Sequence, residues 1–297
     1  LIMIIKINRK EALNLNDEAT ARMLPRILEG SQIPKLIHQT FCDRNSLPKE
    51  LKDNIEYIKA INPGWEHRLY DDKDIIKFIK ENYGDRILQY YLRINPVYGA
   101  GKADFFRYLC IYKLGGVYID IKSTFKKPLD SVIRPDDRFL LSQWKNGSGE
   151  SFEGWGKHAS LALIDGGEFQ QWHIVAVQGH PFLKAVIKKV LNNIETYNPF
   201  LHGMGYQALW MTTGPIAYTL AIDPIRGLHP HRYLDIISEG GFQYSIYGRD
   251  GEKSHHHIFK SHYTSVYKPV VRINFCKKAG WEIINFFRNL KPLFMKH

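Results

Sequence analysis

The chain has 297 residues, of which 44% are hydrophobic and 24% are charged. That length supports one large domain or two small ones with a sizeable core, and the composition excludes a mainly disordered or fibrous protein. A net charge of +11 predicts anionic partners such as nucleotides, phosphates, nucleic acid or acidic lipid. Three cysteines are too few for a disulfide framework, and no run approaches the roughly 20 apolar residues of a membrane span.

The first half of the chain alternates strand-like and helix-like segments. Short apolar runs predict strands at 33–41, 66–70 and 117–121. Apolar residues at helical spacing predict helices at 47–61, from 71 or 72 to 83, at 86–94 and at 98–114. The last of these helices ends at Gly115-Gly116, a strong helix-stop signal. This alternation predicts an α/β layered domain with a mainly parallel central sheet flanked by helices.

The second half of the chain is mixed. Strands are predicted at 139–144, 161–164, 173–177, 233–237 and 255–261. Helices are predicted at 181–197 and, interrupted by Gly214-Pro215, at 206–221. No clean boundary divides these elements, so we expect one continuous domain at 33–267.

The two ends of the chain read differently from this domain. Residues 1–32 look like a lead-in, and residues 268–297 form a basic segment in which Lys and Arg alternate with aromatic residues. That pattern predicts an amphipathic helix, which either contacts an anionic membrane or packs as a solvated helix on the domain.

The stretch with the clearest chemistry runs from the helix at 98–114 into the strand at 117–121. Asp104 and Arg107 are three residues apart and share one face of the helix. Asp120 lies at the carboxyl end of the strand, where open α/β sheets bind their ligands. A carboxylate there can accept hydroxyl hydrogen bonds or hold Mg²⁺ or Mn²⁺, and a nearby arginine can hold phosphate oxygens. A plain surface ion pair between Asp104 and Arg107 is the alternative interpretation.

These residues, in this order, resemble the sugar-binding region of family 32 of the glycosyltransferases, which carries a DXD motif and is related to a block in the clostridial glucosylating toxins. The core of the resemblance is a helix reading Asp-x-x-Arg followed by Gly-Gly-x-Tyr-x-Asp. Further stretches that resemble the family are 33–40, 62–65, 68–72, 179–182 and 213–215.

The resemblance implies a GT-A type fold and a retaining transfer of a sugar from a nucleotide diphosphate donor. His38, Gln39 and Thr40 would lie near the nucleotide. Asp104 and Arg107 would hold the donor sugar and its phosphates, Tyr118 would belong to the same binding set, and Asp120 would bind hydroxyls. The candidate catalytic residues are Asp120, Arg107 and Lys122.

One position departs from the family pattern. The second Asp of the motif, which the family uses for a divalent cation, is Lys122 here. Three interpretations stay open. Mn²⁺ or Mg²⁺ is held by Asp120 with a later ligand such as His262, Lys122 neutralises the diphosphate in place of the metal, or catalysis is lost. Strand alternation predicts that Asp120 and Lys122 share a face.

The expected function is therefore a hexosyltransferase that uses a UDP- or GDP-linked sugar and a glycan or lipid-linked acceptor, in surface polysaccharide assembly. The alternative is a non-catalytic protein that binds nucleotide or glycan on the same fold. Nucleic acid is not expected as a partner, because no recognised nucleic-acid-binding signature accompanies the charge. The lack of an apparent anchor favours a cytoplasmic location, with peripheral contact at the inner membrane surface through the basic tail. Trp144, Trp155 and Trp172 are expected in the core rather than on a sugar-stacking surface.

Overall fold

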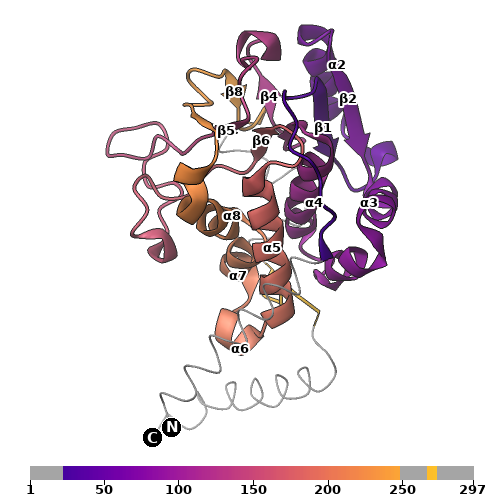
Figure 1. Ribbon diagram of the computed structural model, residues 1–297, viewed down its shortest axis with the longest axis vertical. Coiled ribbons are helices and arrows are strands. Elements are labelled where there is room, and N and C mark those ends of the chain that lie inside the picture. Colours follow the sequence, from indigo (N-terminus) through magenta and orange to yellow (C-terminus); the bar gives the residue numbers. More distant parts are fainter. Residues whose placement is uncertain (1–22, 248–265, 273–297) are drawn as a thin grey trace, which may run out of the picture.

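The computed structural model describes residues 23–247 and 266–272. Its centre is a six-stranded sheet in the order β2-β1-β3-β6-β5-β7 (Figure 1). The strands are β1 (Leu36–Thr40), β2 (Glu66–Tyr70), β3 (Gly116–Ile119), β5 (Phe139–Leu141), β6 (His173–Ala176) and β7 (Arg232–Tyr233). The pairings β1–β2, β1–β3 and β5–β7 are parallel, whereas β6 runs antiparallel to both β3 and β5. The predicted α/β class with a mainly parallel sheet is confirmed.

Two apolar cores lie on opposite faces of this sheet because side chains alternate along each strand. In β3, Tyr118 faces one core, and Val117 and Ile119 face the other. In β6, Ile174 and Val175 divide in the same way. The sheet is therefore buried on both faces, as the nearly continuous apolar strands predict.

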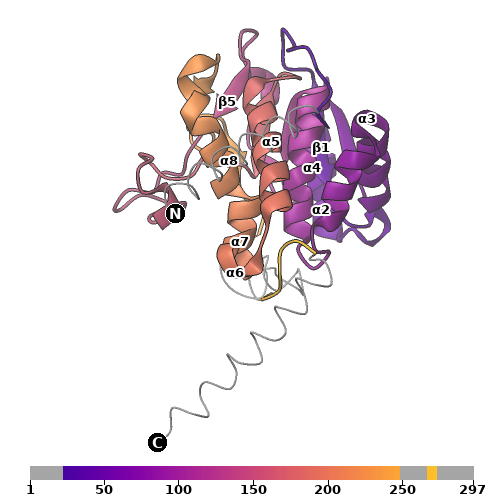
Figure 2. The same ribbon diagram turned by 60° about the horizontal axis from the view of Figure 1, so that its bottom comes forward.

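A layer of helices covers the first face. These helices are α3 (Asp72–Arg93), α4 (Gly99–Leu114), α5 (Pro181–Thr196), α6 (Pro199–His202), α7 (Gly205–Thr212) and α8 (Pro215–Ile222). Figure 2 shows α4 and α5 side by side against the sheet. None of the helices in the described part of the chain has a stretch long and apolar enough to cross a membrane.

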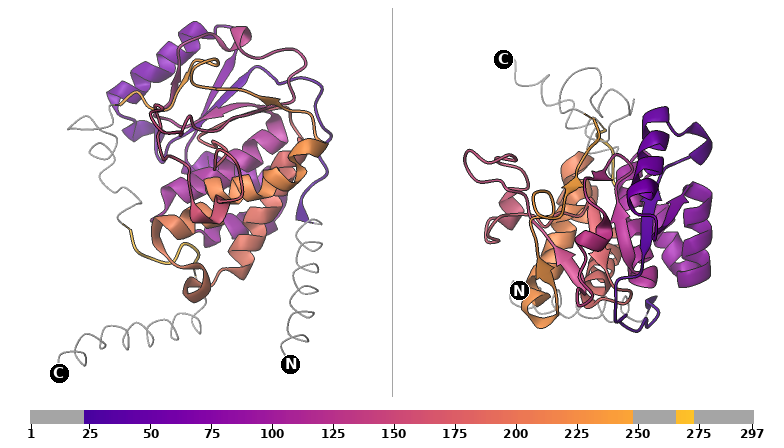
Figure 3. Two further views of the ribbon diagram at one scale, coloured as in Figure 1. Left: turned by 90° about the vertical axis from the view of Figure 1, so that its left-hand side faces the viewer. Right: turned by 90° about the horizontal axis from the view of Figure 1, so that it is seen from above.

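The second face is covered by helix α2 (Lys49–Ile61) and by a small sheet that pairs β4 (Thr124–Phe125) with β8 (Phe242–Gln243). Figure 3 shows the main sheet between α2 on one side and the helical layer on the other. Short 3₁₀ turns complete the chain at Arg44–Ser46, Leu129–Ser131, Ala159–Leu161 and Asp223–Leu228. In Figure 1 the long connection between β5 and β6 projects on the left, beside α8 and away from α2.

Local signals explain most of the helix ends. Asp71 and Asp74 form a reciprocal capping box at the start of α3. The two helices predicted at 71–83 and 86–94 are joined into α3 across Gly84, whose φ of 77° breaks the helical conformation. The α4 helix ends as predicted, at Gly115 with a φ of 68°.

Some sequence predictions about elements and boundaries differ from the structure in the described residues. The strand predicted at 161–164 is a 3₁₀ turn followed by a loop in which Leu163 is fully exposed. The domain begins before residue 33, because Leu24 is buried in the first core and Gly30 bonds to Gln178. It also extends past 267, because Val270 and Val271 are buried in the same core. The strand predicted at 255–261 and most of the basic segment lie outside the described residues.

Candidate functional site

The site lies where three strand ends meet. Because β1 and β3 are parallel, their carboxyl ends, Thr40 and Ile119, lie at the same edge of the sheet. Strand β6 is antiparallel to β3, so it begins at that edge with His173. The chain just before β6 is joined to the chain just after β3, since the Asp120 amide donates to the Trp172 carbonyl over 2.9 Å. Segments more than 50 residues apart are thereby brought together.

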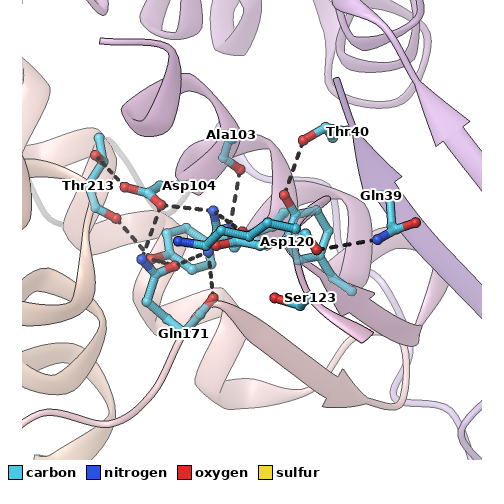
Figure 4. Close-up of polar contacts among 12 residues, drawn as sticks. Gln39, Thr40, Ala103, Asp104, Asp120, Ser123, Gln171 and Thr213 are labelled. Atoms are coloured by element: carbon cyan, nitrogen blue, oxygen red, sulfur yellow. Dashed lines mark hydrogen bonds and ion pairs between the residues drawn. The ribbon is translucent and has the colours of Figure 1, made fainter. Parts of the chain in front are cut away.

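The guanidinium of Arg107 is the centre of the site. One nitrogen lies 3.1 Å from Asp104 and 3.0 Å from Asp120, and another donates to the backbone carbonyl and side-chain oxygen of Gln171 over 2.6 and 2.7 Å. Figure 4 shows Asp104, Asp120 and Gln171 close together at the site. Burial opposes the charge of Arg107, but Asp120 and Asp104 outweigh that effect and raise its pKa above the usual value. The cation is therefore permanent.

Asp104 is the buried partner of this pair. Its side chain accepts from Gln171 over 3.1 Å and from the Thr213 hydroxyl over 3.2 Å, and only 7% of that side chain is exposed. Burial raises its pKa to about 6, in spite of the lowering effects of Arg107 and the two hydrogen bonds. The interpretation of Asp104 and Arg107 as a plain surface ion pair is wrong, because neither side chain is at the surface.

Asp120 is the accessible member of the site. One oxygen of its carboxylate is fixed by Arg107, and 24% of its side chain is exposed. Within the described residues, no hydrogen bond or ion pair engages its second oxygen. Asp120 thus presents an oriented acceptor at the edge of the sheet.

Residues at the ends of β1 and β3 help to hold Arg107 and Asp120 in place. The Arg107 guanidinium lies over the Tyr118 ring, 4.8 Å from its centroid, and the Tyr118 hydroxyl pairs with Thr40 at 3.1 Å. The Gln39 amide donates to the Asp120 carbonyl over 3.3 Å. Burial raises the pKa of Tyr118 to about 12, so its hydroxyl stays neutral. Gln39 and Tyr118 are buried and position other groups, while Thr40 is half-buried.

His38 was predicted to lie near the nucleotide, and the structure gives it a packing role instead. None of its surface is exposed, and its ring nitrogens contact the Tyr70 hydroxyl and the Gly115 carbonyl, both at 3.1 Å. A carbonyl only accepts, so the nitrogen facing Gly115 carries the proton and the other accepts from Tyr70. Burial lowers the pKa of His38 to about 3, and the ring is neutral.

Lys122 lies in a turn rather than in the strand. Strand β3 ends at Ile119, and the Ser123 amide donates to the Asp120 carbonyl over 2.8 Å. The prediction that Asp120 and Lys122 share a strand face is therefore wrong. The ammonium of Lys122 instead donates to the Tyr244 hydroxyl over 2.9 Å and lies 4.1 Å from the centroid of that ring.

The residues that the structure describes do not fit a divalent cation. Metal sites for Mg²⁺ or Mn²⁺ need several oxygen ligands. Within 23–247 and 266–272, no group of three or more His, Cys, Asp or Glu side chains could hold a metal ion. One oxygen of Asp120 is already paired with Arg107, and the second motif position is Lys122. The other predicted ligand, His262, lies outside the described residues.

An aromatic cluster adjoins Lys122. Its members are Trp144, Phe152, Trp155, Trp172 and Tyr244, with neighbouring ring centroids about 5 to 6.5 Å apart. Trp144 and Trp172 are buried, as the sequence predicted, whereas Trp155 is 37% exposed at the edge of the cluster. The core prediction is confirmed for two of the three tryptophans.

Sequence reasoning missed three polar residues of the site: Gln171, Thr213 and Tyr244. A polar pair, Gln170-Gln171, comes just before the buried strand β6. It points to the site only once β6 is known to run antiparallel to β3, because that brings the start of β6 to the end of β3. Thr213 belonged to a stretch that resembled the family, without an assigned role. No local signal singles out Tyr244, which reaches Lys122 from a distant segment.

Taken together, the site offers a fixed cation paired with two carboxylates, and one carboxylate oxygen available to a ligand. Such a group can accept hydrogen bonds from sugar or ribose hydroxyls, and its position at the carboxyl ends of parallel strands is where α/β sheets bind nucleotides. These features define a sugar-nucleotide-binding class of protein.

The comparisons with known proteins concern the same region. Residues 48–140 match the family model described as "Glycosyltransferase sugar-binding region containing DXD motif". This region holds Asp104, Arg107 and Asp120, and it is the part of the chain that is similar to that family.

Curated relatives extend the match beyond this region. The chain is 31% identical over 173 residues to the initiation-specific alpha-1,6-mannosyltransferase of Candida albicans, covering 54% of this chain and 43% of that protein. It is 24% identical over 236 residues to inositol phosphoceramide mannosyltransferase 3 of Schizosaccharomyces pombe, covering 78% of this chain and 55% of the relative. The chain spans about half the length of these relatives. Among solved structures, the PaToxG glycosyltransferase matches with a TM-score of 0.48 and 16% identity, over 77% of this chain and 82% of that one.

Proposed function

We propose that this chain transfers a hexosyl group, a mannosyl group in the first instance, from a nucleotide diphosphate sugar to an acceptor hydroxyl with retention of anomeric configuration. The observation that carries the proposal is the Asp120 carboxylate, fixed on one side by buried Arg107 and accessible on the other. The choice of mannose rests on the names of the curated relatives, which are mannosyltransferases.

The residues of the site have separate tasks in this proposal. Asp120 accepts hydrogen bonds from hydroxyls of the donor and fixes the orientation of the sugar. Arg107 holds the Asp120 carboxylate in place, and it supplies positive potential beside the departing diphosphate. Asp104 and Gln171 hold Arg107 in one rotamer, so the cation requires no reorganisation during transfer.

Retention is proposed from the resemblance to the family, and a route without a covalent intermediate is proposed because no carboxylate of the described site is free to act as the nucleophile. Asp104 is buried and bonded to three groups, and Asp120 is on the donor side in this arrangement. The acceptor hydroxyl would attack on the face from which the diphosphate leaves. The anomeric configuration of an isolated product, measured by NMR, tests this point, and an inverted product contradicts it.

The first experiment is nucleotide release from a panel of UDP- and GDP-linked hexoses that includes GDP-mannose, with mannose-containing glycans and lipids as acceptors. Asp120→Asn keeps the shape and removes the charge, so we expect its turnover to fall by at least 100-fold while the fold is retained by circular dichroism. Asp53→Asn, on the exposed face of α2, is the matched control and should keep full turnover. Near-normal turnover in Asp120→Asn would defeat the proposal.

A second candidate function is favoured by Lys122 alone. A chain that has lost the second motif carboxylate could retain nucleotide or glycan binding without transfer. Binding of a sugar nucleotide with no turnover in the presence of any acceptor would support this candidate over the first.

The acceptor and the location of the protein are also proposals. We infer a glycan or lipid-linked acceptor, used in surface polysaccharide assembly from the cytoplasmic side, with the basic tail at the membrane surface. Sedimentation of the full chain with vesicles containing anionic lipid tests the last point, and the same chain ending at residue 272 is its control.

A further inference from the structure

The starting observation is the charge of the site. Arg107 is flanked by two carboxylates, Asp104 and Asp120, at 3.1 and 3.0 Å, so its positive charge is already compensated. A nucleotide diphosphate brings about two further negative charges next to them. Nothing in the pairings of Arg107 compensates those charges, and a divalent cation does not fit the residues of 23–247 and 266–272. A donor site of this kind requires another cation.

The position of Lys122 makes it the candidate for this second cation. It follows Asp120 by two residues within one turn, so their Cα atoms are at most about 7.6 Å apart. The turn is fixed on both sides, since the Ile246 amide donates to the Lys122 carbonyl over 2.8 Å and the Ser123 hydroxyl donates to the Tyr244 carbonyl over 2.7 Å.

The ammonium group is held rather than free. It donates one hydrogen bond to the Tyr244 hydroxyl and lies over the Tyr244 ring, while the Tyr244 ring packs against Trp144 and Trp172. An ammonium carries three N–H donors, so two remain for a ligand. The aromatic face stabilises the cation without neutralising it.

We infer that Lys122, positioned by Tyr244, binds the diphosphate of the donor and takes the place of the divalent cation, so that this chain binds its donor without metal. The inference rests on the proposed function and names the group that makes it work in the absence of the second motif carboxylate.

In the transfer step, Lys122 forms no covalent bond. The bond between the anomeric carbon and the diphosphate oxygen breaks, and its electron pair leaves with the diphosphate. The acceptor oxygen bonds to the anomeric carbon, and its proton passes to the departing phosphate oxygen. Lys122 donates hydrogen bonds to the leaving diphosphate, whose charge increases as the bond breaks.

The test is equilibrium binding of UDP and GDP to the full chain by calorimetry, in EDTA and again with Mn²⁺. We expect equal affinity in both conditions. Lys122→Met keeps the length of the stem and removes the charge, so it should weaken binding by about 10- to 100-fold in EDTA. Lys126→Met removes the same charge from an exposed position four residues away and should change affinity by less than about twofold.

A third variant reverses the substitution. Lys122→Asp completes the Asp-x-Asp pattern of the family and removes the cation, so we expect it to bind nucleotide weakly in EDTA and to recover affinity with Mn²⁺. Circular dichroism of each variant checks the fold.

The outcomes separate the two proposals. Wild-type binding that requires Mn²⁺ overturns the metal-free inference and leaves the transferase proposal standing. Unchanged affinity of Lys122→Met in EDTA overturns the inference as well. Failure of UDP and GDP to bind under either condition overturns both.

Tyr244 is a positioning residue in this inference, and a double-mutant cycle tests it. Tyr244→Phe keeps the ring and removes the hydroxyl that orients the ammonium. We expect it to weaken nucleotide binding about threefold to tenfold in the wild-type background and not at all in Lys122→Met. Equal losses in both backgrounds would assign Tyr244 a merely structural role.

Discussion

Replacing Gln171 by methionine is the most direct test of how Arg107 is held. The Gln171 side chain accepts from Arg107 over 2.7 Å, donates to Asp104 over 3.1 Å and accepts from the Tyr108 hydroxyl over 3.2 Å. Gln171→Met keeps the length of the side chain and removes all three bonds. A hydrogen bond to a charged group contributes about 1.5–3 kcal/mol, but Gln171 is half-buried and water can replace part of the loss. We therefore expect a decrease of about 3 kcal/mol in the free energy of unfolding.

The neighbouring glutamine provides a matched control. Gln170 is 2% exposed, accepts one bond from Ser142, and its amide nitrogen has no partner in the described structure. Gln170→Met should cost no more than about 1 kcal/mol, because the loss of one bond is offset by removal of an unsatisfied donor. Both values come from urea unfolding followed by circular dichroism, with nucleotide release measured in parallel. Equal costs for the two substitutions, or full activity in Gln171→Met, would refute the assignment of Gln171 as the residue that holds Arg107.

Three further predictions concern groups around the site. Gly116→Ala should cost about 2 kcal/mol or more in urea unfolding, because φ is +98° and the added Cβ would lie 2.6 Å from the Leu36 carbonyl oxygen, whereas Gly99→Ala meets nothing and should be neutral. Thr213→Val should cost about 1–3 kcal/mol in the same assay, since a buried oxygen of Asp104 loses its donor. The pKa of His38 is about 3 when folded and 6.5 when unfolded, so its stabilising contribution is complete above pH 6.5 and is lost as the pH falls towards 3. Between pH 7 and 5 the wild type should therefore lose about 2 kcal/mol more than His38→Gln, and an equal loss in both would contradict the assignment.

The elements that the sequence predicted well are those with strong local signals. Strand β2 at Glu66–Tyr70 has the predicted bounds, and α4 ends at Leu114 because Gly115 adopts a conformation that other residues avoid. The strand predicted to reach residue 121 ends at Ile119, because a backbone turn between Asp120 and Ser123 competes with strand pairing. Alternation of polar and apolar residues does not report such a turn.

The site was predictable only in part, for a related reason. Asp104, Arg107 and Asp120 are found from spacing because one helix and the strand that follows it carry all three. Gln171 and Thr213 enter from an antiparallel strand end and from a helix junction, which sequence periodicity cannot place beside Arg107. The resemblance places His38 near the nucleotide, whereas in the structure Tyr70 and Gly115 engage both of its ring nitrogens inside the core.

The arrangement of Arg107 also explains how the site can tolerate the change at position 122. In this structure the carboxylate of Asp120 is held by the guanidinium of Arg107, which is 3% exposed and is itself held by Asp104 and Gln171. Its orientation therefore does not depend on a second carboxylate or on a bound ion. A substitution at residue 122 changes the charge available to the donor without disturbing Asp120, because Lys122 is bonded to Tyr244 and not to the Arg107 network. The side chains at the two motif positions therefore have separate partners here, Arg107 of α4 for Asp120 and Tyr244, just after β8, for Lys122.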